Sequence, residues 1–276
     1  MSETNSSTPD AWQGRACAWP RREQNTDRIT LIDPADFPDW IVHEDDDLLV
    51  INKTGEVVCH PSKAGPWSSL IGAAREYTGL EKMHLVFRLD RETSGIVVLA
   101  KNPSTASLLQ KAVQDRRIHK TYRAILTGKL KAPVTVDQPL GPDDSSPVFV
   151  KDRVRGDGKS AISVFDPIRC SAKFTLARVK IETGRKHQIR AHAQWLGHSV
   201  VGDKIYGPDD RCYLEFIDHG WTDNLARKLL MRRQALHCAE IDLREVGGAV
   251  YQAPMAADMQ TFLIGAGLGE GARLAT

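Results

Sequence analysis

Short apolar stretches bounded by polar turns run along most of the chain, and they predict strands more often than helices. The acidic turn at residues 44–47 separates two such stretches, which predicts a hairpin that enters the core. The turn at Lys53-Thr54-Gly55 redirects the chain before the next stretch. Further strands are expected at residues 57–60, 96–100, 120–126, 160–166, 174–182, 235–241 and 250–252.

Apolar residues at helical spacing predict fewer helices. Ser68 or Ser69 is a candidate N-cap for a helix that ends at Gly79, and Ser104 is the expected start of the next helix. Later helices are expected at residues 187–196, 223–233 and 258–264, loops with short edge strands at 129–158, and an irregular insert at 209–219. Because strands often follow one another directly, this pattern favours an α+β fold with a mixed, mainly antiparallel sheet flanked by helices.

The first 28 residues differ from the rest of the chain. They are rich in Ser and Thr and then basic, with Trp12 and Trp19 among the charges, so residues 1–28 are expected to form a loosely ordered tail. Basic and aromatic residues at such spacing can also grip single-stranded RNA, which is the alternative. Residues 29–276 are expected to form a single domain.

Composition narrows the function classes only slightly. Charged residues make up 26% of the chain, as in an ordinary globular protein, and the net charge of +2 neither supports nor excludes RNA binding. The five cysteines form no Cys-x-x-Cys pair, which favours reduced thiols and gives no support to a thiolate zinc site. The sequence shows no signal-peptide pattern, no long apolar run and no glycine-rich nucleotide motif. We therefore expect a cytoplasmic protein with neither a membrane partner nor a nucleotide cofactor.

A charged cluster lies between two apolar stretches in the first half of the chain. Arg88, Asp90, Arg91 and Glu92 form this cluster, which is expected to be a loop between two buried strands. The two neighbouring guanidiniums hold the Asp90 carboxylate in its ionised form. From this stretch alone, a reactive carboxylate and a surface salt bridge are equally consistent.

The densest basic patch lies at residues 116–123. It contains Arg116, Arg117 and Lys120, and the aromatic Tyr122 lies among these cations. A solvated helix end would explain the arginines, but it would not explain an aromatic residue on the strand that follows. We therefore regard Arg116, Arg117 and Lys120 as candidate RNA contacts.

The loop at Asp90 resembles a known signature. Its sequence Arg88-Leu89-Asp90-Arg91-x-Thr93-Ser94-Gly95 is similar to the Arg-Leu-Asp-x-x-Thr-Ser-Gly signature of RNA pseudouridine synthases of the RluA family, in which the Asp is the catalytic residue. Three more stretches resemble that family in the same order: Ile51-Asn52-Lys53-Thr54-Gly55 through His60-Pro61, Lys120-Thr121-Tyr122-Arg123-Ala124, and Thr183-Gly184-Arg185-Lys186-His187-Gln188-Ile189-Arg190 with Gly202-Asp203-Lys204-Ile205-Tyr206-Gly207. Two positions depart from the family pattern, because Phe87 replaces the usual His and Thr54 the usual Pro.

The resemblance implies a pseudouridine synthase catalytic domain at residues 29–276, built on a bent, mostly antiparallel sheet with the active site in a cleft along it. It also implies the reaction. The bond from the ribose to N1 of uracil breaks, the base turns in place, and the ribose is rejoined through C5. Because this isomerisation involves no redox change and no energy input, no cofactor and no metal are expected.

Individual roles follow from the matched positions. The resemblance implies that Asp90 is the essential carboxylate, that Arg190 pairs with it, and that Tyr122 stacks on the target uracil and is a candidate for proton transfer at C5. It further implies that Leu236 lines the base pocket and that Arg88 moves into the space left by the flipped nucleotide. Further RNA contacts are assigned to Arg185, Lys186 and His187.

The sequence leaves the details of the reaction open. Asp90 could attack the sugar, attack the base or remove a ribose proton. The substrate is expected to be a stem-loop of ribosomal or transfer RNA, because taking a base out of its stack costs least in loops and bulges. A monomer is expected.

Other functions are also possible. Asp90 and Asp203 could form a glycosidase pair, and His187, His192 and His198 could join Asp203 in a metal site. The metal site is disfavoured because His187 and His192 are five positions apart and do not share a helical face. A protein that keeps the fold but only binds RNA or assists ribosome assembly is the main alternative from another class.

Overall fold

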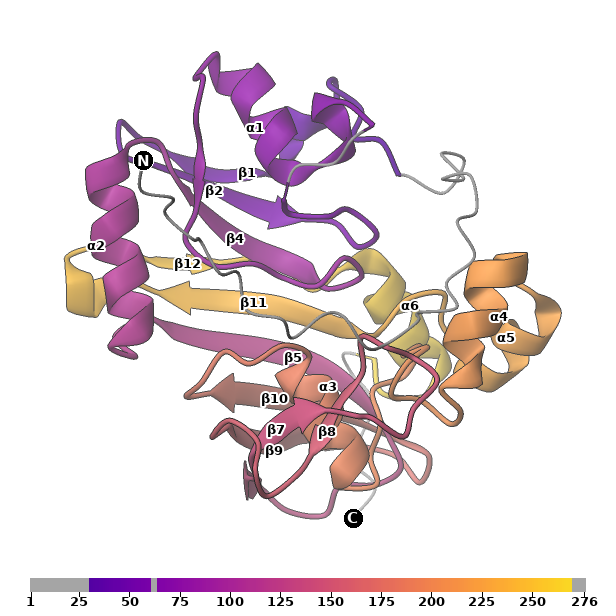
Figure 1. The fold of residues 1–276 in the computed structure, drawn as a ribbon. Helices are drawn as coiled ribbons and strands as arrows, with labels where there is room; N and C mark the ends of the chain where they lie inside the picture. Colours follow the sequence, from indigo (N-terminus) through magenta and orange to yellow (C-terminus); the bar gives the residue numbers. More distant parts are fainter. Residues whose placement is uncertain (1–29, 61–63, 270–276) are drawn as a thin grey trace, which may run out of the picture.

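The computed structural model describes residues 30–60 and 64–269, so the predicted tail at residues 1–28 lies outside the described part of the chain. Figure 1 shows a large main sheet, with the pair α4 and α5 on the opposite side of the molecule from α2. The described helices are α1 (Leu70–Thr78), α2 (Pro103–Gln114), α3 (Gln188–Trp195), α4 (Arg211–His219), α5 (Asp223–Leu229) and α6 (Ala257–Gly265), with short 3-10 turns η2 (Phe37–Trp40), η3 (Pro66–Ser68) and η4 (Arg244–Val246).

The main sheet has the strand order β1-β2-β4-β11-β5-β10-β9-β6, with β3 also paired to β4 and β12 to β11. Its strands are β1 (Ile41–Glu44), β2 (Leu48–Lys53), β3 (His84–Leu85), β4 (Ser94–Ala100), β5 (His119–Thr127), β6 (Val134–Asp137), β9 (Ile162–Cys170), β10 (Phe174–Ile181), β11 (Leu236–Asp242) and β12 (Val250–Gln252). A separate antiparallel pair contains β7 (Leu140–Pro142) and β8 (Asp152–Val154). Among the described strands, only β11 and β4 run parallel, which confirms the predicted α+β fold with a mainly antiparallel sheet.

The centre of the sheet is buried on both faces. Every residue of β4 is buried, and Leu49, Ile51, Leu99 and Ile125 of three strands are completely inaccessible to solvent. Burial of such side chains contributes about 1.5–3 kcal/mol each, so these strands are the stable part of the fold. The loop that carries Asp90 is anchored directly to this core.

Gly95 fixes the end of that loop. It has a φ of +110°, and a Cβ at this position would collide with the carbonyl oxygen of Cys238 on β11. Only glycine allows this backbone conformation and this close approach. The register between the start of β4 and β11 is therefore fixed, with Ser94 and Gly95 paired to His237 and Cys238.

Several helix predictions are confirmed and others are wrong. Ser69 caps α1 and Gly79 ends it, as expected. The next helix begins earlier than predicted, because Asn102 accepts a hydrogen bond from the backbone of Thr105 and Pro103 occupies the first turn. The predicted irregular insert at residues 209–219 is mostly the helix α4. The helix expected at 223–233 ends at Leu229, because Leu230 adopts a left-handed conformation.

Two strand predictions also need correction. Residues 57–60 form no strand, and only Val58 makes a bridge, to Ser69. Strand β9 continues through Pro167, where a turn was expected. It can do so because Pro167 lies at a register shift opposite β10, a place where a missing N–H disturbs the ladder least. Within the described residues, no helix is long and apolar enough to cross a bilayer.

Candidate active site

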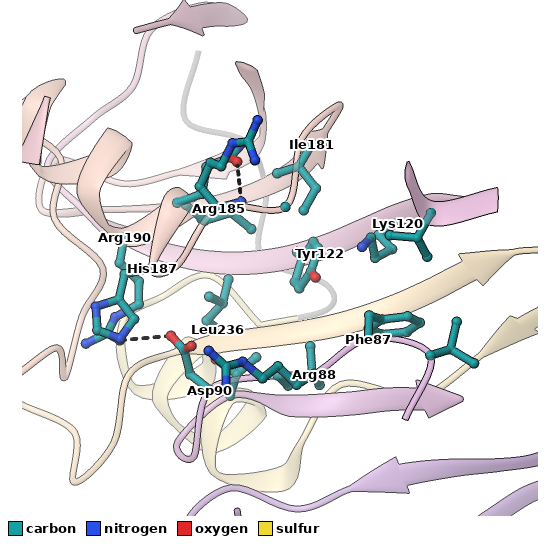
Figure 2. Close-up of a pocket in the computed structure, with 17 residues that line it drawn as sticks. Phe87, Arg88, Asp90, Lys120, Tyr122, Ile181, Arg185, His187, Arg190 and Leu236 are labelled. Carbon is teal, nitrogen blue, oxygen red and sulfur yellow. Dashed lines mark hydrogen bonds and ion pairs between the residues drawn. The ribbon is translucent and has the colours of Figure 1, made fainter. Parts of the chain in front are cut away.

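A cleft of about 300 Å³ opens along the sheet where segments that are distant in sequence meet. Most of the lining comes from the Asp90 loop, strand β5, the turn that leads into α3 and the start of β11, and α2 and β10 contribute one residue each (Figure 2). The labelled lining residues are Phe87, Arg88, Asp90, Lys120, Tyr122, Ile181, Arg185, His187, Arg190 and Leu236. Eight of these were singled out from the sequence as site residues; Phe87 and Ile181 were not.

Helix α3 delivers Arg190 to the cleft. His187 precedes the helix in a left-handed conformation, and the side chain of Gln188 accepts hydrogen bonds from the backbone N–H of Arg185 and the hydroxyl of Thr183. These bonds hold the turn that starts the helix. The guanidinium of Arg190 donates to Asp90 at 2.8 Å, across a separation of 100 residues, as predicted.

Arg190 also binds a second carboxylate. Its Nε and Nη2 donate to the two oxygens of Asp203 at 2.6 and 2.8 Å, and the ring of Tyr206 lies 5.0 Å from its Cζ. This two-pronged contact fixes the plane of the guanidinium. Arg190 is therefore already oriented when it meets Asp90. The role of Asp203 as the anchor of Arg190 was not predicted from the sequence, although Asp203 lies in a motif that matches the family.

The electrostatics keep both carboxylates charged. Burial is the largest single influence on the pKa of Asp90 and raises it, but the positive charge of Arg190 and the side-chain hydrogen bonds from Arg190 and Gln234 together outweigh burial, so the pKa lies below its ordinary value of 3.8. Burial also raises the pKa of Asp203, but the charge and hydrogen bonds of Arg190, together with two backbone hydrogen bonds, lower it by more, so its pKa too lies below the ordinary value. Burial, followed by the charge of Arg190, lowers the pKa of His187 to about 4, so its imidazole is neutral at pH 7.

A network of charged side chains holds the Asp90 loop from behind. The buried ammonium of Lys204 donates to Glu92 at 2.7 Å, and the backbone N–H of Gln234 donates to the other carboxylate oxygen of Glu92. The ammonium of Lys53, which is completely buried, donates to the carbonyl of Arg91. These contacts fix the residues that directly follow Asp90. None of these roles was predicted from the sequence, because each depends on long-range packing.

Tyr122 and Leu236 form one wall of the cleft on neighbouring strands. They belong to β5 and β11, which pair antiparallel, with Tyr122 opposite Cys238. Only 6% of Tyr122 is exposed. Burial, with a smaller contribution from the nearby Cys238, raises its pKa well above the ordinary value, so the phenol keeps its proton at neutral pH.

The remaining predicted RNA contacts divide into three groups. Arg88, Arg185, His187 and Lys120 line the cleft. Lys186 lines an adjoining cavity of about 460 Å³ that shares Asp90 and Arg190 with the cleft, and its ammonium pairs with Asp152 at 2.8 Å. Arg116 and Arg117 follow α2 and line neither of these cavities. Their contact with RNA stays a prediction.

The histidines proposed for a metal site have different partners. His187 contacts the hydroxyl of Tyr206, His192 contacts Ser163 and the carbonyl of Gln138, and His198 contacts the carbonyl of Thr127. Within residues 30–60 and 64–269, no three His, Cys, Asp or Glu side chains converge in a way that could hold a metal ion.

The glycosidase reading is also not favoured by the geometry. Asp203 is completely buried, and its oxygens accept hydrogen bonds from two guanidinium nitrogens and from the backbone of Ile205 and Tyr206. A second catalytic carboxylate has to reach a water molecule or the sugar. Asp203 has no such access.

Comparison with known proteins shows relatives with similar sequences and a solved structure with a similar fold. A family model described as RNA pseudouridylate synthase matches residues 47–195. Ribosomal large subunit pseudouridine synthase D of Haemophilus ducreyi is 32% identical over 234 residues, which cover 82% of this chain and 70% of that protein. The protein of the same name from Vibrio vulnificus is 35% identical over 207 residues, which cover 73% of this chain and 62% of that protein.

A solved structure extends the likeness to the fold. The human protein RNA pseudouridylate synthase domain containing 4 superimposes with a TM-score of 0.67 at 24% identity, over 84% of this chain and 94% of that one. The family model, the sequence relatives and the fold agree. The chain therefore belongs to the RNA pseudouridylate synthase family, as a member of the RluA type, and the enzymes of this family are isomerases.

Proposed function

We propose that this chain converts specific uridines of structured RNA to pseudouridine, with Asp90 as the essential carboxylate and without a cofactor. The observation that carries the proposal is the contact of Asp90 with Arg190 in a cleft whose wall contains Tyr122. About a third of the Asp90 side chain (32%) is exposed, so a substrate can reach the carboxylate.

The residues of the cleft match the needs of the reaction. Breaking the bond between C1′ and N1 requires a negative group near the ribose, and Asp90, whose pKa lies below its ordinary value, supplies it in ionised form at neutral pH. The detached uracil has to stay in place while it turns, and the walls formed by Tyr122 and Leu236 restrict it. Tyr122 keeps its phenolic proton and can therefore donate a hydrogen bond to the base or take part in proton transfer.

We propose large-subunit ribosomal RNA as the first substrate to test, because two relatives carry that substrate in their names. Transfer RNA is the second. The target uridine must leave its stack to enter the cleft, at a cost of a few kcal/mol that is smallest in a loop or bulge. Arg88 is exposed at the mouth of the cleft, next to Asp90, where it can occupy the vacated space in the RNA. We further propose that the protein acts as a monomer in the cytoplasm.

A tritium-release assay tests this function. Formation of the bond between C1′ and C5 expels the hydrogen at C5, so a transcript of bacterial large-subunit ribosomal RNA labelled with tritium at C5 of uridine releases label in proportion to product. We expect release by the wild type and a loss of at least about a thousandfold in Asp90→Asn, with the dissociation constant for RNA nearly unchanged. Tight binding by the wild type without release from ribosomal or transfer RNA would indicate a non-catalytic RNA-binding protein instead.

A further inference from the structure

Lys120 brings a positive charge into the cleft that the protein itself does not neutralise. Its side chain and that of Tyr122 are two positions apart on β5, so both point to the same face of the sheet. Among the contacts of the described residues, Lys120 has neither a carboxylate within ion-pair distance nor a hydrogen-bond acceptor for its ammonium. The ring of Phe87 lies beside the ammonium, with its centroid 4.7 Å from Nζ, and the protonated thiol of Cys238 is also near.

Lys120 and Asp90 lie at opposite ends of the cleft (Figure 2). In Figure 2, Asp90 and Arg190 lie on one side of the cleft, Lys120 and Phe87 on the other, and Tyr122 between them. The apolar side chains of Val113 and Ile181 line the same cleft as Lys120. Burial lowers the pKa of Lys120 from its ordinary value of 10.5.

A half-buried cation in a cleft, with no carboxylate of the described residues paired to it, suggests that the substrate supplies the negative charge. This argument rests on the isomerisation proposed above. When the bond between C1′ and N1 breaks, its electron pair leaves with the uracil, and the charge spreads over N1, O2 and O4. The pair then forms the bond between C5 and C1′, C5 loses its proton, and N1 gains one.

The shape of the uracil ring identifies the atoms that can reach Lys120. C4 lies opposite N1 in the ring, and C2 lies opposite C5. With the ribose at Asp90, the carbonyl farthest from the sugar is therefore O4 in uridine and O2 in pseudouridine. A single cation at the far end of the cleft meets both carbonyls in turn.

We propose that Lys120 is a catalytic residue that donates a hydrogen bond to the far carbonyl of the target uracil and stabilises the base while it is detached from the ribose. Phe87 is a positioning residue, because its ring lies beneath the ammonium and restricts it by a cation–π contact. An aromatic ring suits this position, since it stabilises the cation without providing a competing acceptor. A phosphate of the RNA backbone is the other anion that Lys120 could bind, and the apolar lining of the cleft argues against it.

The test compares three variants of the full chain. Lys120→Met removes the charge at nearly constant volume, and Lys120→Arg restores a charged donor. Lys180→Met is the matched control, because Lys180 is an exposed lysine on the neighbouring strand β10, one position before Ile181, and faces away from the cleft. For each protein, tritium release is measured in single turnover at saturating enzyme, and the dissociation constant for the same ribosomal transcript is measured separately.

We expect the saturating rate of Lys120→Met to fall about a hundredfold, the loss typical of removing one donor that stabilises a developing anion. Lys120→Arg should recover most of the rate, and the dissociation constant should change less than about threefold, since one neutralised phosphate would mainly alter affinity. Lys180→Met should match the wild type. An unchanged saturating rate with weaker binding in Lys120→Met would overturn the proposal in favour of a phosphate contact.

A modified substrate tests the contact with O4 itself. Once the converted uridine is mapped, a short stem-loop is made with 4-thiouridine at that position, because sulfur accepts hydrogen bonds more weakly than oxygen. The rate of the wild type should fall about tenfold more than that of Lys120→Met, whose contact is already lost. Equal losses in both proteins would contradict the proposed contact. If the wild type converts no RNA, the proposed function itself fails; if it converts RNA and Lys120→Met does so equally fast, only the role of Lys120 fails.

Discussion

Asp90 and Asp203 both accept hydrogen bonds from the guanidinium of Arg190, but the two carboxylates lie in different environments. Asp203 is completely buried, and four donors satisfy its two oxygens. Asp90 is 32% exposed; the guanidinium of Arg190 donates to it, and a side-chain hydrogen bond from Gln234 also helps to lower its pKa. The guanidinium of Arg190 therefore contacts a solvent-inaccessible carboxylate, Asp203, and a solvent-accessible one, Asp90.

This difference in environment indicates a structural role for Asp203 and a chemical role for Asp90. A buried carboxylate with every acceptor position occupied can do little except hold its partner in place. A carboxylate that is kept ionised but still has free acceptor positions toward a cavity can act on a substrate. Asp203 therefore positions Arg190, and Arg190 keeps Asp90 charged. The comparison can be tested by changing each side separately.

The largest expected effect on stability concerns Asp203. Asp203→Asn removes one partner of a buried ion pair and should lower the free energy of unfolding by about 3–5 kcal/mol. Asp90→Asn should lower it by no more than about 1 kcal/mol, because Asp90 is partly exposed and Arg190 keeps its bond to Asp203. Urea denaturation of both variants measures these differences. Equal losses would mean that the two carboxylates are not distinct in role.

The next largest effect is a loss of activity, expected when Tyr122 in the cleft beside Asp90 is changed. Tyr122→Phe keeps the aromatic wall but removes the hydroxyl, so the rate of tritium release should fall about a hundredfold. Binding of RNA and the free energy of unfolding should change little, because no described hydrogen bond of the fold depends on this hydroxyl apart from its contact with the thiol of Cys238. A rate equal to that of the wild type would show that the hydroxyl takes no part in the reaction.

Acid should weaken the fold through both carboxylates. Their pKa values are lower in the folded protein than the ordinary value of 3.8, so the folded state binds fewer protons than the unfolded chain. Their contribution to stability is complete above pH 3.8 and is lost as the pH falls through the folded-state pKa values. Unfolding curves at a series of pH values should show a smaller acid slope in Asp203→Asn than in the wild type. An identical slope would contradict the lowered pKa of Asp203.

The smallest effect is expected outside the cleft. Replacing both Arg116 and Arg117 by Gln should weaken RNA binding about threefold at low salt and leave the rate at saturating enzyme unchanged, because neither residue lines the cavities. The dependence of binding on salt concentration should become less steep. If both affinity and salt dependence stay the same, the two arginines are only the solvated end of a helix.

Local signals account for the elements that were predicted well. The hairpin of β1 and β2, the cap at Ser69 and the strand that carries Tyr122 each follow from neighbouring residues. Two of the errors also had local signals. Asn102 followed by Pro103 is a typical helix start, and Cys212 and Phe216 lie at helical spacing in α4.

The sequence by itself determined the alternating strands, the charged loop at Asp90 and the ordered motifs that indicated the family, since all of these depend on residues close together in the chain. Tertiary structure alone decided that Asp203 anchors Arg190, that Glu92 and Lys204 support the loop, and that Lys120 enters the cleft while Arg116 does not. The physical reason is distance along the chain. Partners such as Asp90 and Arg190 are 100 residues apart, and only packing of the sheet brings them together.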